Sequence, residues 1–162
     1  MVGNGYVGDR NKQGRPHGNG RYTFDSGGTY EGDWEEGKRQ GLGKIIYPSG
    51  EWRKGQWNND QLDGFVEAIY SNGNRFEGEF RKGCFHSGTL KTIGSTYEGG
   101  FDCEGNCHGK GKMTFKDGTI IECKWEHGKA IGMGTEKTVE GGIQRFEDIA
   151  PVVKYHHLGN SE

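Results

Sequence analysis

Apolar and polar residues alternate along much of this chain, and residues 30–50 show the pattern most clearly. Tyr30, Gly32 and Trp34 occupy alternate positions, and a polar turn at residues 35–39 separates them from a second alternating run. Alternation at period two predicts a β-strand with one face selected for burial. Two such runs around a short glycine-containing turn predict a β-hairpin.

Side-chain parity assigns the residues of this hairpin to two faces of a sheet. One face receives Tyr30, Gly32, Trp34, Gly41, Gly43, Ile45 and Tyr47, and the other receives Glu31, Asp33, Leu42, Lys44 and Ile46. We expect large rings to pack over the bare glycines of neighbouring strands and to stack from one hairpin to the next. The opposite, largely polar face can remain in contact with water.

The hairpin recurs six times at a nearly constant period. The first-strand glycine stands at Gly8, Gly32, Gly55, Gly78 and Gly99, and Cys123 takes its place in the sixth unit, so units begin 21 to 24 residues apart. The chain has 32 glycines among 162 residues, and because they are periodic they indicate a repeat array rather than a flexible linker. The sequence therefore predicts an all-β fold, a thin sheet of six hairpins and about 12 strands with one aromatic face.

The repeated segments match a known family. YEGDW at 30–34, FEGEF at 76–80, YEGGF at 97–101 and HGKGKMTFKDG at 108–118 resemble the MORN repeat (membrane occupation and recognition nexus). This resemblance implies one elongated, twisted antiparallel sheet over residues 6–141, with units 6–29, 30–52, 53–75, 76–96, 97–120 and 121–141. Arg10, Arg53, Ser87 and Cys123 depart from the usual aromatic or glycine at their positions.

Bulk properties narrow the classes of function. The formal net charge of −2 gives no case for nucleic-acid binding, and no apolar run approaches the roughly 20 residues of a membrane helix. The amino-terminal residues lack a signal peptide's apolar stretch and a glycine at position 2 for myristoylation. Four irregularly placed cysteines fit free thiols in a reducing cytoplasm.

A zinc-binding site is the most specific alternative to free thiols for the cysteines. Cys84 and His86 fall in the turn of the fourth unit, and Cys103 and Cys107 fall in the turn of the fifth. Thiolates and imidazoles are zinc ligands, and we expect equivalent turns to lie about 10 Å apart, two strand spacings. His108 follows the repeat's usual His-Gly-x-Gly pattern, and Cys-x3-Cys is a weak spacing by itself. The sequence therefore leaves zinc binding by these four residues open and predicts no cofactor.

Catalysis and membrane binding have less support in the sequence. No phosphate-binding loop or strand-to-helix nucleophile elbow is recognisable, and the catalytic domains found beside other MORN arrays have no counterpart here, so we expect no enzyme activity. Binding to anionic lipid needs clustered basic residues, and Lys110 with Lys112 makes only a local pair. A membrane-associated adaptor that binds anionic phospholipids is kept as the alternative function.

A protein-binding scaffold is the preferred interpretation. An aromatic-lined sheet face suits a partner's helix or extended segment, and Tyr and Trp are frequent hot-spot residues. The opening unit is similar to the first repeat of radial spoke head proteins, which favours a cytoskeletal assembly in the axoneme of motile cilia or flagella. Expected partners are other protein subunits, a second MORN protein or a second copy. The predicted partner-binding residues are Tyr30, Trp34, Tyr47, Trp57, Tyr70, Phe76, Phe80, Tyr97, Phe101, Phe115 and Trp125.

The tail at residues 142–162 completes the expected organisation. Ile143 could start a seventh strand, and Pro151 should interrupt any regular element. Because repeat arrays need covered ends, we expect this tail to cap the last hairpin and to contact a partner.

Overall fold

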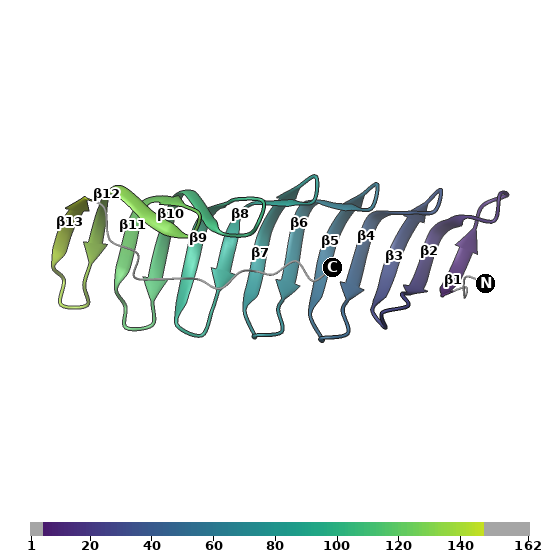
Figure 1. The fold of residues 1–162 in the computed structure, drawn as a ribbon, viewed down its shortest axis with the longest axis horizontal. Coiled ribbons are helices and arrows are strands. Elements are labelled where there is room, and N and C mark those ends of the chain that lie inside the picture. Colours follow the sequence, from purple (N-terminus) through teal and green to yellow (C-terminus); the bar gives the residue numbers. More distant parts are fainter. Residues whose placement is uncertain (1–4, 148–162) are drawn as a thin grey trace.

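The chain forms one open, single-layer β-sheet in a computed structural model, which describes residues 5–147. Thirteen antiparallel strands follow one another in chain order, each pairing with the next (Figure 1). The strands are β1 Tyr6–Arg10, β2 Pro16–Thr23, β3 Thr29–Glu35, β4 Lys38–Ile46, β5 Trp52–Asn58, β6 Gln61–Ile69, β7 Arg75–Arg81, β8 Cys84–Lys91, β9 Ser95–Phe101, β10 Cys107–Phe115, β11 Ile120–Glu126, β12 Lys129–Lys137 and β13 Ile143–Glu147.

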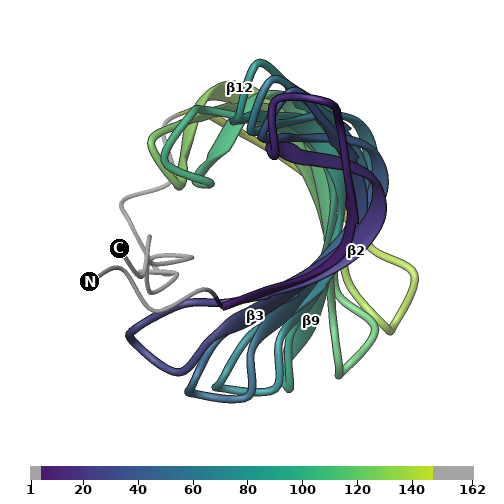
Figure 2. The same cartoon turned by 90° about the vertical axis from the view of Figure 1, so that its right-hand side faces the viewer.

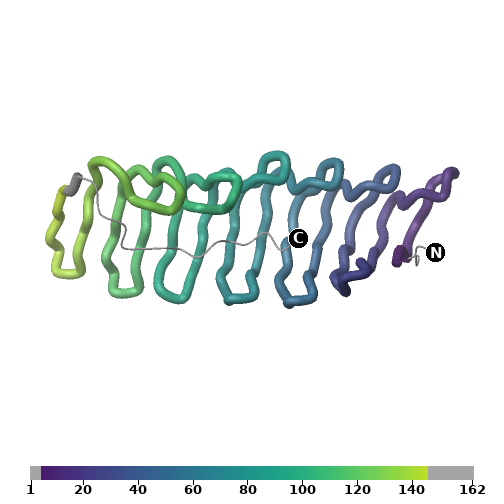
Figure 3. The backbone as a smooth tube through the Cα atoms, in the orientation of Figure 1, coloured from purple at the N-terminus to yellow at the C-terminus, as the bar shows by residue number. Residues whose placement is uncertain are grey.

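The strands are curved, so the sheet has a C-shaped cross-section when viewed along its length (Figure 2). Turns within each hairpin lie along one long edge of the sheet, and turns between hairpins lie along the other (Figure 3). The expected all-β architecture is confirmed, and residues 5–147 contain strands and turns without helix. Within that range no helix is long and apolar enough to cross a bilayer.

The turn inside the second hairpin is tighter than the sequence predicts. We expected a polar turn over residues 35–39, but β3 continues to Glu35 and β4 begins at Lys38. Only Glu36 and Gly37 reverse the chain, and both have left-handed backbone angles, with φ of 51° and 87°. Two consecutive positive φ angles match the twist of the paired strands, so the hairpin closes in two residues.

A transverse row of small residues crosses eleven strands. In register from β1 to β11 it contains Gly8, Gly20, Gly32, Gly43, Gly55, Val66, Gly78, Gly88, Gly99, Gly111 and Cys123. Aromatic rings lie on this row: a Cβ on Gly20, Gly43 or Gly111 would overlap the ring of Tyr6, Tyr30 or Tyr97. Glycine is required at these three positions because a tyrosine ring occupies the space that a side chain would need. This agrees with the packing of rings over glycines that the sequence predicts.

The aromatic rings form two separate stacks along the sheet. Tyr6, Trp34, Tyr30 and Trp57 form the first, and Phe80, Phe76, Phe101, Tyr97 and Trp125 form the second, with ring centroids 5.1–5.7 Å apart and near-perpendicular planes. The two stacks are separated at the third unit, where Arg53 stands at the position that Tyr30 occupies in the second unit. Leu62, Val66 and Ala68 are buried at this interruption, which explains why the glycine row can carry a valine there.

The sheet extends past the expected end of the array. β13 pairs with β12 through residues such as Ile143, opposite Lys137, so the additional strand suggested at Ile143 is present, as the thirteenth of the sheet. It has no following partner strand within the described residues. The expected interruption at Pro151 and the capping role of residues 148–162 lie outside the described residues.

Candidate protein-binding surface

The eleven aromatic residues predicted to bind a partner lie on one face, which we call the aromatic face. Nine of them are buried within the isolated chain: Tyr30, Trp34, Trp57, Tyr70, Phe76, Phe80, Tyr97, Phe101 and Trp125. Tyr47 and Phe115 are partly buried against the same cluster. The structure therefore gives these side chains a packing role, and their contact with a partner stays a prediction.

Polar atoms of the aromatic face are largely engaged inside the sheet. The indole N–H groups of Trp34, Trp57 and Trp125 each donate to a glycine carbonyl of a neighbouring hairpin at 3.1 Å. The hydroxyls of Tyr30 and Tyr97 donate to backbone carbonyls three residues ahead, at 3.2 and 3.0 Å. Burial raises the pKa of both hydroxyls above the ordinary tyrosine value. Few of these groups are left to recognise a ligand.

The opposite face, called here the polar face, carries exposed apolar residues that the sequence interpretation did not select. Leu42, Ile46 and Phe65 are 65%, 40% and 57% exposed. They line a shallow hollow of about 890 Å³ that spans β2 to β6. An apolar residue at a position whose parity is otherwise polar is the sequence signal that could have identified them. Accessible apolar surface in this part of the chain therefore lies opposite the ring stack.

Charged residues cross the polar face in a second transverse row. Arg21, Glu31, Lys44, Lys54, Glu67 and Glu77 are successive register partners on β2 to β7. Three of the five junctions pair opposite charges, including Lys54 with Glu67, but Lys44 faces Lys54, and Glu67 faces Glu77. Like charges directly opposite each other destabilise a sheet. The row therefore presents a basic pair and an acidic pair, two strand spacings or roughly 10 Å apart.

Hairpin turns of adjacent units contact one another along one edge of the sheet. Arg39 donates through its backbone N–H and its Nε to Asp60 Oδ1, both at 3.0 Å, and the fourth and fifth units are joined by a disulfide between Cys84 and Cys103. The expectation of free thiols is therefore wrong for these two residues. Their Cα atoms are 4.5 Å apart, closer than the expected 10 Å, because β8 and β9 are adjacent strands.

The disulfide also changes the zinc alternative. Cys84 and Cys103 are no longer thiolate ligands, and Cys107 is buried with its thiol pKa raised by burial to about 12. The structure thus does not assemble a zinc site from Cys84, His86, Cys103 and Cys107. Among the described residues, a different group, Asp102 with His108 and His127, brings metal-ligand atoms together.

Comparison with known proteins supports the fold and the repeat. No curated protein matches the sequence. A solved structure of the SAS-4 (dCPAP) TCP domain of Drosophila melanogaster, in complex with a proline-rich motif of Ana2 (dSTIL), is similar with a TM-score of 0.53. That similarity covers 90% of this chain and 79% of the other, at 17% sequence identity, and so concerns the fold. Residues 12–29, 30–53, 54–75 and 97–120 match the MORN repeat itself. These matches take in more than half of the chain, which therefore belongs to the MORN repeat family.

Proposed function

We propose that this protein is a non-enzymatic scaffold that binds an extended segment of another protein across the polar face of β2–β7. The observation that carries the proposal is the hollow lined by Leu42, Ile46 and Phe65 together with the charged row, in which two like-charged pairs face each other. Exposed apolar surface bordered by charge is typical of an interaction site. The aromatic face supports the sheet from the other side and keeps this surface rigid.

The chemistry of the expected partner follows from the charged row. An acidic residue of the partner would relieve repulsion between Lys44 and Lys54, and a basic residue would do the same for Glu67 and Glu77. The two partner charges would stand roughly 10 Å apart along a segment that runs across the strands. Apolar side chains between or beside them would enter the hollow next to Phe65.

In its most specific form, the proposal places the scaffold in a cytoskeletal assembly, the radial spoke head of motile cilia. The support is the long turn of the first unit, Arg10 to Gly14, which is similar to the opening repeat of radial spoke head proteins. The fold neighbour from Drosophila was solved with a bound proline-rich motif, which is compatible with a sheet of this kind receiving an extended segment. Localisation of the tagged protein along the axoneme tests this part separately.

The binding surface is tested by affinity capture from a ciliated source with three full-length baits. The wild-type chain is compared with Lys44→Glu/Lys54→Glu and with the control Lys116→Glu, which changes an exposed charge in a turn outside the hollow. We expect one set of partners to be retained by wild type and control and lost with the double variant. Equal capture by all three baits would contradict the assigned surface.

The lipid-adaptor alternative is separated by sedimentation with vesicles of phosphatidylcholine, with and without phosphatidylserine. We expect the wild-type chain to remain in the supernatant with both. Salt-sensitive pelleting with phosphatidylserine, lost in Lys44→Glu/Lys54→Glu, would instead favour the adaptor, because a basic pair binds an anionic surface.

A further inference from the structure

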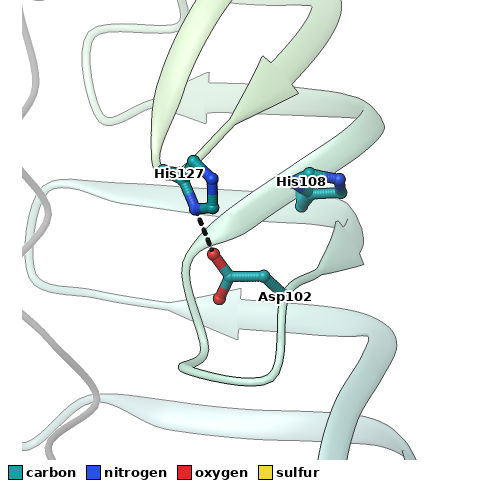
Figure 4. A group of neighbouring side chains, drawn as sticks. All are labelled: Asp102, His108 and His127. Atoms are coloured by element: carbon teal, nitrogen blue, oxygen red, sulfur yellow. Dashed lines mark hydrogen bonds and ion pairs between the residues drawn. The ribbon is translucent and has the colours of Figure 1, made fainter.

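Three metal-ligand side chains meet where the fifth and sixth hairpins touch. Asp102 lies in the turn after β9, His108 lies in β10, and His127 lies in the turn between β11 and β12 (Figure 4). One ligand atom from each lies within 4.8 Å of the other two. Residues from three separate positions in the chain are thus gathered by the register of consecutive hairpins. We propose that Asp102, His108 and His127 form a zinc-binding site, with water completing the coordination.

The distances suit a small transition-metal ion. His127 Nδ1 and Asp102 Oδ2 are 3.0 Å apart. Two ligands bound tetrahedrally at 2.0–2.1 Å from zinc are separated by roughly 3.3 Å, so this pair needs little adjustment when a cation replaces the shared proton. The ligand atom of His108 lies within 4.8 Å of the other two, and a rotation of its side chain would bring it into the coordination shell. Two imidazole nitrogens and one carboxylate oxygen are ligand types that zinc accepts.

The carboxylate of Asp102 is held in place by its own turn. Its Oδ1 accepts hydrogen bonds from the backbone N–H groups of Glu104 and Asn106 at 3.0 and 2.9 Å. The side-chain amide of Asn106 donates to Oδ2 at 3.0 Å. A ligating carboxylate oriented by hydrogen bonds is the usual support of a metal site. Asp102 is also the more enclosed member, with 13% of its side chain exposed against 69% for His127.

The same position in the first and second hairpins provides an internal comparison. Asn11, His17 and Glu36 occupy the places equivalent to Asp102, His108 and His127, each 91 residues earlier. There Asn11 Oδ1 accepts two turn N–H groups, and Asn11 Nδ2 donates to Glu36 Oε1 at 2.8 Å. At this first junction the two turns are therefore joined by a direct hydrogen bond between an amide and a carboxylate. The junction of the fifth and sixth hairpins has the same contact between turns, but Asp102 and His127 replace the amide and carboxylate pair. A carboxylate and an imidazole bind metal far better than a neutral amide does.

The test uses the full chain with its disulfide intact, freed of metal by a chelator that is then removed. Zn²⁺ is titrated calorimetrically into the wild type, His127→Gln and Asp102→Asn, with His17→Gln as the matched control. We expect one equivalent of Zn²⁺ to bind to wild type and control. Because even supporting residues change metal affinity by about 10–100-fold, loss of a ligand should weaken binding by at least about tenfold. Asp102→Asn retains the turn's acceptor, as Asn11 does, so it separates ligation from folding.

A second variant tests sufficiency. Asn11→Asp/Glu36→His builds the same three ligand types at the first junction and should raise the stoichiometry from one to two. The Co²⁺ derivative of the wild type should show tetrahedral ligand-field bands without a thiolate charge-transfer band. Failure of the wild type to bind one equivalent, unchanged binding in His127→Gln, thiolate ligation of Co²⁺, or a stoichiometry of one in the double variant would each overturn the proposal.

Discussion

The phenol ring of Tyr30 in β3 lies directly on Gly43 in β4. A Cβ on Gly43 would overlap this ring, and Tyr30 itself is completely buried. In the next unit the equivalent positions, 23 residues later, are Arg53 and Val66. Where the ring is missing, the glycine has become a valine that fills the same space and is itself fully buried. Ring and glycine thus act as a pair, because one occupies the volume that the other leaves open.

Substituting Gly43 tests this pairing. Gly43→Ala should lower the free energy of unfolding by about 1–3 kcal/mol, the usual cost of overpacking. Gly94→Ala is the control, because a Cβ there meets open space, and its effect should stay within about 0.5 kcal/mol. Chemical denaturation measures both. Similar stabilities for the two variants would show that the ring does not need the glycine.

A double variant tests whether the residue pair of the third unit, Arg53 and Val66, can replace Tyr30 and Gly43 in the second unit. Tyr30→Arg and Gly43→Val should each be destabilising alone, whereas the combined variant should lose less stability than the two losses added together. Residues in contact commonly show coupling of about 0.5–3 kcal/mol. A double-mutant cycle in denaturant measures this coupling, and strict additivity would contradict the pairing.

The assignment of faces is tested within β3. Trp34 is 8% exposed and packs between Tyr6 and Tyr30, so Trp34→Ala should cost about 3–5 kcal/mol. Glu31 is exposed on the polar face, and Glu31→Ala should change stability by no more than about 0.5 kcal/mol. Equal shifts of the denaturation midpoint would mean that the two faces are assigned wrongly.

Alkaline titration should report the buried tyrosines. Burial raises the pKa of Tyr30, Tyr70 and Tyr97 above the ordinary value of about 10. A folded-state pKa above the unfolded one means that this stabilisation is complete below about pH 10 and is lost as the pH rises toward the folded value. The tyrosinate absorbance of these three residues should therefore develop late and together with loss of the β-sheet circular dichroism signal. Ionisation of all seven tyrosines near pH 10 with the sheet intact would contradict this.

The disulfide between Cys84 and Cys103 should stabilise the junction of the fourth and fifth hairpins. It closes a loop with a sequence separation of 19 residues, and loops near this length correspond to about 3 kcal/mol of unfolding free energy. Cys84→Ser/Cys103→Ser should lose up to that amount. The denaturation midpoint of the oxidised wild type, compared with that of the double variant, measures the loss. Equal midpoints would show that the cross-link contributes nothing to stability.

Thiol labelling distinguishes the remaining cysteines. Cys107 is 2% exposed and its pKa is raised by burial, so it should resist alkylation until the sheet unfolds. Cys123 is only partly buried and serves as the comparison, with faster labelling expected. Mass spectrometry of the labelled peptides gives both rates. Rapid labelling of Cys107 in the native protein would contradict its place in the core.

Much of this fold can be predicted from the sequence because its contacts are local. Each strand pairs with the next strand in the chain, so the 21–24-residue period and the two-residue alternation are sufficient for topology, register and the burial of Tyr30 and Trp34. The predicted stack of rings over glycines follows from the same parity. The turn length was misjudged because the left-handed backbone of Glu36 is not visible in its residue type.

Contacts between hairpins are different, because they depend on where side chains meet after the strands have paired and curved. Parity alone placed Leu42 and Ile46 on the polar face but could not show that they border a hollow. The sequence left Cys84 and Cys103 as free thiols or zinc ligands, and the cross-link between them appears only because β8 and β9 are adjacent strands. Likewise, Asp102 and His127 are 25 residues apart and meet because two successive turns lie one unit apart along the same edge of a curved sheet.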